Sequence, residues 1–293
     1  MKFNRLLSAI AALVLAVLAA QAHTPDSTVA AAGSRPERPV LSAYTVSAGS
    51  SHVAETYLSP LKYSGWSTAL AYERTQAMRF APGRWVMRLH GKLAVERTLS
   101  PARNASMWGL DLNIGWGMMR RFRLNSSWNI LAGGATDISG GVLYTPRNGN
   151  NPVAAKASWT VNATAGAVFN TRIGRLPISA RYIAEMPLTG IFFSPEYGEL
   201  YYEIYIGNHK GLVRGAWPGN FFRLDNLATV DLRLGRTIIR AGYRCGIFSS
   251  KASHIVTRRI SHSFVLGIAS EWIALSAKGN RGLADAEIIS SQY

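Results

Sequence analysis

The clearest pattern in the chain is a strict alternation of apolar and polar residues in the stretch 84–96. Successive side chains of a strand point to opposite faces, so this stretch would have one apolar wall and one charged wall. The apolar wall holds Trp85, Met87, Leu89, Gly91, Leu93 and Val95. The other wall holds Arg84, Arg88, His90, Lys92 and Glu96, with Val86 and Ala94 among them. Thirteen residues is long for a strand of a soluble sandwich and suits a tilted strand that crosses a membrane.

The same alternation recurs along the chain and predicts further strands. The predicted strands are 41–50, 66–72, 84–96, 108–118, 122–130, 155–169, 176–184, 224–234, 237–247 and 261–275. Trp108 and Trp116 share one apolar wall and are expected at the two membrane interfaces, because indole rings prefer the headgroup level. The pattern predicts an all-β fold, a single antiparallel transmembrane β-barrel with its apolar walls toward lipid. A pair of secreted β-sandwiches is the alternative.

Turn lengths predict the orientation of the barrel, because bacterial barrels have short periplasmic turns and longer external loops. Tight turns are expected at 119–122, 171–175 and 235–236, which places both termini in the periplasm. On the other side, residues 134–153 are rich in Gly, Asn, Asp and Pro and are predicted to form a long external loop. Residues 187–222 form either one very long external segment with its own hairpin or two more strands. We therefore predict about ten strands, with about twelve as the alternative.

The N-terminal residues predict export. Lys2 and Arg5 precede an apolar run over residues 6–20, and Ala20-Gln21-Ala22 has the pattern of a signal-peptide cleavage site. Such a chain is expected in the outer membrane of the cell, as a barrel that follows a cleaved signal peptide. The expected organisation is a signal peptide at 1–22, a periplasmic linker at 23–40, the barrel at 41–275 and a polar C-terminal tail at 276–293. The single cysteine, Cys245, excludes an intrachain disulfide framework.

Composition agrees with a membrane barrel and narrows the set of partners. Hydrophobic residues make up 48% of the chain and charged residues only 16%, which is low for a soluble domain. The net charge of +16 in an exported chain points to outer-membrane lipid and lipopolysaccharide, and not to nucleic acid. The barrel assembly machinery is an expected partner during insertion. The pattern makes no prediction of the oligomeric state.

Charged residues on the predicted inner walls are the candidate lumen or ligand-binding residues. They are Arg88, His90, Lys92, Arg181, Arg236, Arg240 and Arg244. Their simplest role is structural ion pairing with carboxylates on other inner walls. These carboxylates are Glu96, Asp111, Glu185, Asp225, Asp231 and Glu271. The alternative is an anion-attracting constriction formed by the basic residues of 236–244, although aqueous channels typically need about 16 or more strands.

A second group of candidates lies in the least barrel-like part of the chain, residues 186–208. Here Tyr197, Tyr201 and Glu203 lie among further tyrosines and glutamates. Aromatic and acidic groups together suit a carbohydrate or a cation, and they also suit a hairpin that packs over the barrel mouth. Both interpretations predict that this segment lies at the external end.

Known catalytic and metal-binding patterns are missing from the sequence. Lipid-modifying barrels use a histidine base and a serine nucleophile two residues apart on one lipid-facing strand. None of the six histidines has a serine two positions later, and only Ser50 and His52 have this spacing in reverse. We find no zinc-ligand spacing, phosphate-binding glycine loop or EF-hand. The expectation is that the protein is not an enzyme and binds no cofactor or metal.

Four phrases of the chain resemble those of a known family. They are YLSPLKYSG at 57–65, ER at 73–74, FSPEYGELYYEIYIGN at 193–208 and SHSFVLG at 261–267. They resemble an uncharacterised family of outer-membrane β-barrel proteins from Bacteroidota-type bacteria, a domain of unknown function, over about residues 45–275. The resemblance implies location and fold and supplies no catalytic residue. The expected role is structural or ligand-binding in the envelope, with a narrow charged lumen; the alternatives are a small anion-preferring channel and, third, a lipid-modifying enzyme.

Overall fold

The computed structural model describes residues 38–149, 151–207, 209–235, 237–272 and 290, all of which belong to the compact unit Pro36–Tyr293. The predicted signal peptide, almost all of the predicted linker and nearly all of the polar tail lie outside the described residues, as does Arg236. No helix in the described part of the chain is long and apolar enough to cross a membrane.

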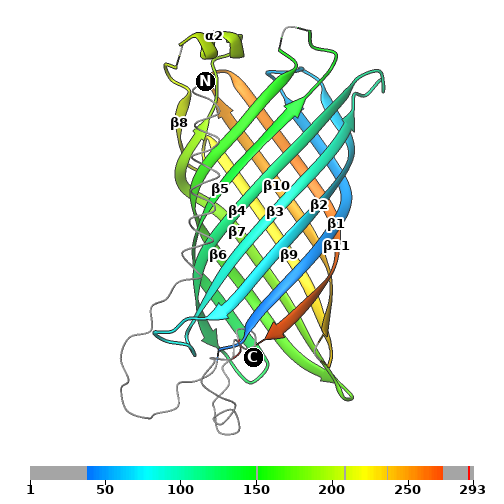
Figure 1. Ribbon diagram of the computed structural model, residues 1–293, viewed down its shortest axis with the longest axis vertical. Helices are drawn as coiled ribbons and strands as arrows, with labels where there is room; N and C mark the ends of the chain where they lie inside the picture. The colour runs from blue at the N-terminus through cyan, green and yellow to red at the C-terminus, as the bar shows by residue number, and fades with distance from the viewer. Residues whose placement is uncertain (1–37, 150, 208, 236, 273–289, 291–293) are drawn as a thin grey trace. The chain divides into compact units, whose positions relative to one another are not determined.

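Ten long strands close into one antiparallel barrel (Figure 1). The strands are β1 (Val40–Glu55), β2 (Lys62–Ala77), β3 (Trp85–Leu99), β4 (Ser106–Arg123), β5 (Trp128–Tyr144), β6 (Val153–Ile173), β7 (Leu176–Phe193), β9 (Phe221–Leu234), β10 (Thr237–Ala252) and β11 (Ile255–Trp272). Each pairs with the next in this order, and β11 pairs with β1 to close the ring. The ten-strand prediction is confirmed.

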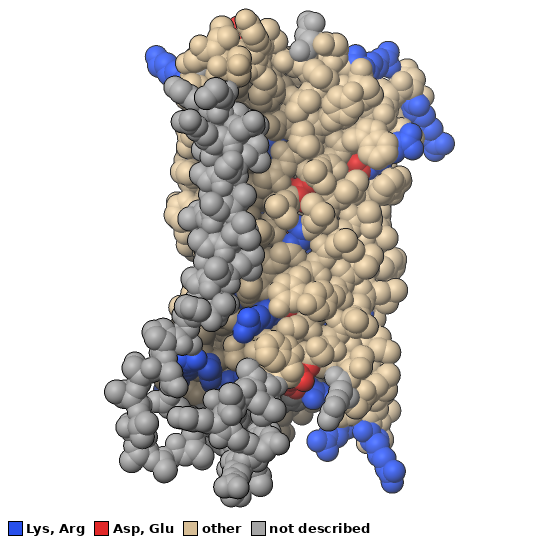
Figure 2. All heavy atoms as spheres, in the orientation of Figure 1, with Lys and Arg blue, Asp and Glu red and all other residues tan. Residues whose placement is uncertain are grey.

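Lipid-facing and lumen-facing residues alternate along these strands as predicted. On β3, Arg88 and Glu96 are buried inside the barrel, whereas Leu93 is exposed on the outer wall. The outer wall is strongly apolar: Phe264 is 76% exposed and Leu70 is 60% exposed. Figure 2 shows Lys and Arg side chains projecting at both ends of the barrel, while the wall between them is mostly uncharged. Exposed apolar surface on this scale is typical of a barrel surrounded by lipid.

The predicted turn at 119–122 is wrong, because β4 continues to Arg123 and the turn follows at 124–127. Arg121 points into the barrel, is buried, and donates a hydrogen bond from Nη2 to the carbonyl of Ser290 at 2.8 Å. Arg120 points outward and its guanidinium lies 5.1 Å from the ring centroid of Phe122. The two arginines therefore follow the strand alternation. Their charge alone does not make a turn.

The predicted long loop at 134–153 is also wrong in most of its length. Strand β5 continues to Tyr144, paired with β4 and β6, and only residues 145–152 form the connection. Two glycines of β5 have a packing role. A Cβ added at Gly133 would lie 2.0 Å from the carbonyl oxygen of Met118 on β4, and one added at Gly141, inside the predicted loop, would lie 2.7 Å from that of Leu110, so the close approach of the two strands requires glycine there.

The segment predicted at 187–222 is one long connection rather than two more barrel strands. Strand β7 continues to Phe193, and residues 194–220 then carry the short helix α2 (Tyr201–Ile206) and the four-residue strand β8 (Val213–Ala216). Strand β8 pairs only with the end of β7, from Gly190 to Phe193, and is not part of the ring. The two longest connections, 145–152 and 194–220, lie at one end of the barrel, the long-loop end, and the turns at 124–127 and 174–175 lie at the other, the short-turn end (Figure 1).

Candidate functional site

A buried ion cluster fills the lumen nearer the short-turn end, around Glu73 of β2. Arg88 Nε lies 2.9 Å from Glu73 Oε2, and Arg240 Nη1 lies 3.2 Å from Glu73 Oε1. Arg181 also pairs with Glu73. Arg181 is on β7, which is five strands from β2 in the ring of ten, so this pair joins opposite walls. Side chains of this length meet across a barrel only where its lumen is narrow.

Further carboxylates complete this cluster. Arg240, which is 1% exposed, donates from Nε and Nη2 to the two oxygens of Asp231, both at 2.7 Å. Arg88 Nη1 lies 3.0 Å from Glu185 Oε2, and Asn162 Nδ2 donates to Glu185 Oε1 at 2.6 Å. Bidentate pairing fixes both the position and the plane of a guanidinium. Arg88 and Arg240 are each held between two carboxylates in this cluster.

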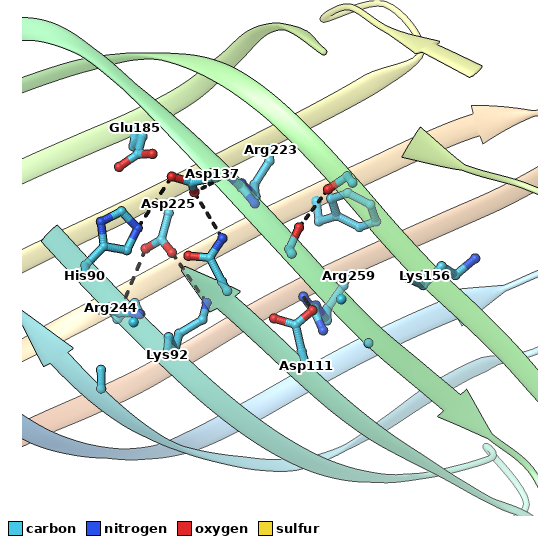
Figure 3. A pocket seen from close by; sticks show the side chains of 18 of the residues that line it. His90, Lys92, Asp111, Asp137, Lys156, Glu185, Arg223, Asp225, Arg244 and Arg259 are labelled. Carbon is cyan, nitrogen blue, oxygen red and sulfur yellow. Dashed lines mark hydrogen bonds and ion pairs between the residues drawn. The ribbon is translucent and has the colours of Figure 1, made fainter. Parts of the chain in front are cut away.

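A second level of ion pairs lies further along the lumen. Lys92 Nζ on β3 is 3.6 Å from Asp225 Oδ2 on β9, again five strands away in the ring. Arg244 Nε on β10 lies 3.9 Å from the other oxygen of Asp225. Figure 3 shows these three side chains converging from different walls. Nearby, Arg259 lies between Asp111, at 3.5 Å, and Glu96, at 3.6 Å.

A third level lies close to the long-loop end. Lys156 Nζ on β6 is 2.7 Å from Glu55 Oε2 on β1, the strand on the opposite wall. The Thr257 hydroxyl of β11 donates to Glu55 Oε2 at 2.7 Å and lies 3.0 Å from Lys156 Nζ. Glu55 is completely buried. A buried carboxylate is stable when a cation and hydrogen bonds compensate for its lost hydration, as here.

The lumen is therefore crossed by opposite-wall ion pairs at three levels. Within the described residues, its ion pairs join nine cations to nine carboxylates. The cations are Arg88, Lys92, Lys156, Arg181, Arg223, Arg233, Arg240, Arg244 and Arg259. The carboxylates are Glu55, Glu73, Glu96, Asp111, Asp137, Glu185, Asp225, Asp231 and Glu271. Arginines do not outnumber carboxylates in this set.

A cavity of about 130 Å³ remains between these levels. Towards the Glu73 cluster its wall is formed by His90, Asp137 and other polar side chains (Figure 3). Towards the long-loop end its wall includes Phe192, Phe221 and Phe248, whose rings pack in sequence with centroids 5.0 and 5.2 Å apart. The cavity has a charged part and an aromatic part, which suits a small polar or amphipathic ligand.

One group on the cavity wall has the composition of a metal site. His90, Asp137 and Glu185 each offer a ligand atom, and these atoms lie within 4.8 Å of one another. Arg223 Nη2 holds Asp137 Oδ2 at 2.6 Å, and Asn113 Nδ2 donates to the same oxygen at 3.0 Å. Among the predicted candidates, His90 is thus placed beside two carboxylates that the sequence pattern did not associate with it.

Two connections at the long-loop end form a lid, which we define as residues 56–61, 194–207 and 209–212. The Tyr57 hydroxyl donates to the carbonyl of Glu199 at 2.6 Å, and the Tyr57 and Tyr201 rings meet edge to face with centroids 6.0 Å apart. Tyr201 accepts a hydrogen bond from the N–H of Ala155 at 2.7 Å. Burial raises the pKa of the Tyr201 phenol to about 12, although the Ala155 N–H acts in the opposite direction. Burial, then Tyr201 and Glu199, raise the pKa of Tyr57.

Other predicted candidates of this segment do not join a site. Tyr197 is 64% exposed. Glu203 Oε2 accepts a hydrogen bond from the N–H of Leu200 at 2.9 Å and so caps the start of α2. Arg236 lies outside the described residues. The interpretation of this segment as a packed lid fits Tyr201 and Glu203, since both make structural contacts.

Removing the Tyr57 hydroxyl should loosen the lid. Tyr57→Phe leaves the Glu199 carbonyl without its hydrogen bond and should lower the stability of the closed lid by about 1 kcal/mol. Limited trypsinolysis of the folded protein, followed at Lys210, should then be about fivefold faster than in the wild type. Tyr202→Phe, at a side chain that is 67% exposed, is the matched control. Equal cleavage rates in both variants would show that the Tyr57 contact does not hold the lid.

The comparison with known protein families decides the classification. A family model described as "Protein of unknown function (DUF3316)" matches residues 7–279. The chain belongs to this family. Membership confirms the predicted relation to an uncharacterised family, and the match spans all ten barrel strands of the DUF3316 protein. No curated protein matches the chain in sequence.

Solved barrels are similar at low identity. The outer membrane protease OmpT from Escherichia coli aligns with 84% of this chain and 100% of its own, at 5% identity and a TM-score of 0.42. The transport unit of the autotransporter AIDA-I from Escherichia coli covers 80% and 90%, at 8% identity and a TM-score of 0.39. A Pseudomonas aeruginosa FadL homologue covers 80% and 90%, at 9% identity and a TM-score of 0.29. None of these values supports a transfer of activity to the DUF3316 chain.

Proposed function

We propose that this DUF3316 protein is an integral outer-membrane barrel that conducts no solute and binds a small ligand in its closed lumen. Its strands are 14 to 21 residues long, and about 9 to 11 residues of a tilted strand suffice to cross a bilayer. The outer wall is apolar around the ring. Because all ten strands are paired, no strand edge of the ring faces lipid.

The orientation follows from the connections. Short turns such as Gly174-Arg175 lie at the end where β1 begins and β11 ends, and this end would face the periplasm. The lid would then lie outside the cell, above the aromatic part of the cavity. Outer-membrane lipid, lipopolysaccharide and the barrel assembly machinery remain the proposed partners of the outer wall.

The observation that carries the proposal is the crossing of the lumen at three levels by Glu73–Arg181, Lys92–Asp225 and Glu55–Lys156. An open bore requires side chains that line the wall, whereas these pairs meet from opposite walls. An anion-preferring channel would need basic groups free to attract the solute. Arg240 and Arg244 instead face Asp231 and Asp225, which disfavours this alternative.

Single-channel recording of the folded protein in planar bilayers tests the proposal. We expect no steady current in the wild type, because the three levels of ion pairs close the lumen. Folding is checked in the same preparation by the change in electrophoretic mobility on heating. A steady current with anion preference, abolished by Arg240→Glu, would instead favour the channel.

We also propose that the protein is not a lipid-modifying enzyme. A histidine and a serine do meet on the outer wall, since His52 Nδ1 lies 2.9 Å from Ser64 Oγ across β1 and β2. The pairing depends on the register of β1 and β2, which spacing along one strand does not predict. Among the described residues, no carboxylate forms an ion pair with His52, and catalytic Ser–His pairs are generally oriented by such a third group. Release of fatty acid from phospholipid vesicles, lost in Ser64→Ala, would overturn this part of the proposal.

A further inference from the structure

The group formed by His90, Asp137 and Glu185 has a function that the sequence did not predict. We propose that these three side chains bind a divalent transition metal ion, of the Zn²⁺ class, inside the barrel. One imidazole and two carboxylates from β3, β5 and β7 converge within 4.8 Å. This ligand set suits borderline divalent ions and leaves coordination positions for water or a bound solute. The inference rests on the proposed function, a closed lumen that binds a small ligand, because it names the class of that ligand.

The backbone brings the first two ligands together. His90, Gly115 and Asp137 are direct register partners on β3, β4 and β5, so they form one row across three strands. A Cβ added at Gly115 would lie 2.1 Å from Asp137 Oδ1 and 2.4 Å from His90 Cε1. Glycine at this position therefore provides the space in which the imidazole and the carboxylate approach each other.

Neighbouring side chains orient the two carboxylates by hydrogen bonds and ion pairs, as they commonly do for metal ligands. Asp137 Oδ2 accepts hydrogen bonds from Arg223 and Asn113, and Glu185 Oε2 pairs with Arg88. These contacts fix one oxygen of each carboxylate. The second oxygen of Asp137 accepts no hydrogen bond, whereas that of Glu185 accepts one from Asn162 Nδ2 at 2.6 Å. Outer partners of this kind orient metal ligands and commonly affect affinity as much as about 10- to 100-fold.

Asp137 Oδ1 is the atom that most needs a partner. The Asp137 side chain is 3% exposed, and its Oδ1 is buried and accepts no hydrogen bond. His90 Nε2 lies 3.7 Å away, which is within ion-pair distance of a protonated imidazole but too far for a hydrogen bond. A metal ion bound to both atoms would satisfy the oxygen at ordinary ligand distances of about 2.0–2.2 Å after a small movement of the imidazole.

Asn162 of β6 supplies a fourth candidate ligand. Its Oδ1 is buried and accepts no hydrogen bond, while its Nδ2 donates to Glu185 Oε1 at 2.6 Å. The oxygen and nitrogen of an amide exchange places when the group turns over. In that orientation Asn162 Oδ1 would lie next to Glu185 Oε1, and a cation bound beside the two oxygens would replace the hydrogen bond between the side chains.

The histidines of the outer wall show the contrast. His52 lies 2.9 Å from the Ser64 hydroxyl, and His262 Nδ1 lies 2.6 Å from the Tyr243 hydroxyl. Both are thus satisfied by a hydroxyl group, and neither lies beside two carboxylates. Of the residues that the structure describes, His90, Asp137 and Glu185 form the one group with three potential ligands.

Metal titration of the folded, tag-free protein in detergent tests the inference. Calorimetry with Zn²⁺ should show one site per chain, and Co²⁺ should give visible absorption bands typical of bound imidazole and carboxylate. His90→Gln and Asp137→Asn remove a ligand with little change in volume and should weaken binding by at least about tenfold. His52→Gln, on the outer wall, should bind as the wild type does.

Gly115→Ala provides a test in which every ligand is kept. The new methyl group would occupy the space between His90 and Asp137 and should weaken Zn²⁺ binding by about tenfold or more. Gly140→Ala is the matched control, because a Cβ there meets nothing within 4 Å. Heat-dependent mobility verifies that each variant is folded.

Two results would overturn the metal site. One is the absence of stoichiometric Zn²⁺ and Co²⁺ binding by the folded wild type, and the other is equal affinity in the wild type, His90→Gln and Asp137→Asn. Both leave the closed-barrel proposal standing, because that proposal depends on conductance. Conversely, a barrel that conducts and also binds Zn²⁺ through His90 would contradict the closed lumen and leave the metal site standing.

Discussion

Glu73→Ala should lower the free energy of unfolding by about 3–5 kcal/mol, a large part of the stability of a typical domain. The substitution removes the carboxylate that Arg88, Arg181 and Arg240 share and leaves their charges close together in a buried place. Arg240 keeps Asp231 and Arg88 keeps Glu185, so Arg181 loses most. Urea unfolding in detergent micelles, followed by tryptophan fluorescence, measures the effect.

The matched control for this prediction is Glu196→Ala. Glu196 also pairs with an arginine, Arg214, but its side chain is 55% exposed in the lid. Exposed pairs contribute about 0–1 kcal/mol, so this variant should unfold almost as the wild type does. If both variants lost the same small amount, the ion cluster around Glu73 would not be a stabilising feature of the lumen.

The strands were predictable because each depends on a local pattern. Alternation over residues 84–96 reports the two different environments of one strand, and β3 from Trp85 to Leu99 has the predicted walls. The failures also have local causes. The glycines of 134–153 indicate a loop, but Gly141 lies inside β5 at a point where its backbone packs closely against β4. A single sequence does not distinguish these two uses of glycine.

Local alternation does not predict which charged residues of the lumen pair with each other. The sequence placed Arg88, Lys92 and Arg240 on inner walls, and cross-strand ion pairing was expected. Their partners on opposite walls depend on the closure of the ring. Glu73 meets Arg181 although 108 positions separate their numbers, because closure places β2 opposite β7. A strand count of ten and the order of the ring are needed before any such pair can be named.

The candidate metal site was not predictable, because one ligand lies in a glycine-rich segment and another reaches the site only through closure of the ring. Asp137 lay in the segment that was predicted to be a loop, so it was not assigned to an inner wall. His90 and Asp137 are on strands separated by β4, and Glu185 joins them from β7. Gly115 is the register partner of both His90 and Asp137. This row of three residues can be recognised only when the register of β3, β4 and β5 is known.

Exchanging the charges of Glu55 and Lys156 should reveal whether opposite walls are coupled. Glu55→Lys places two cations together at a completely buried position and should cost about 3–5 kcal/mol. Lys156→Glu should cost less, because the Lys156 side chain is 28% exposed. The double variant restores an ion pair across the lumen, so we expect a coupling free energy of about 2–3 kcal/mol in a double-mutant cycle.

Lys251→Glu, on the exposed part of β10, is the matched control for Lys156→Glu, since it makes the same change of charge without a carboxylate partner in the lumen. Combined with Glu55→Lys, it should give additive losses within about 0.5 kcal/mol. Additive losses in the Glu55 and Lys156 cycle as well would mean that the two walls do not interact. In that case the level nearest the lid would be open, and the closed lumen would depend on the Glu73 cluster and the Lys92–Asp225 pair, because those two levels lie deeper in the barrel.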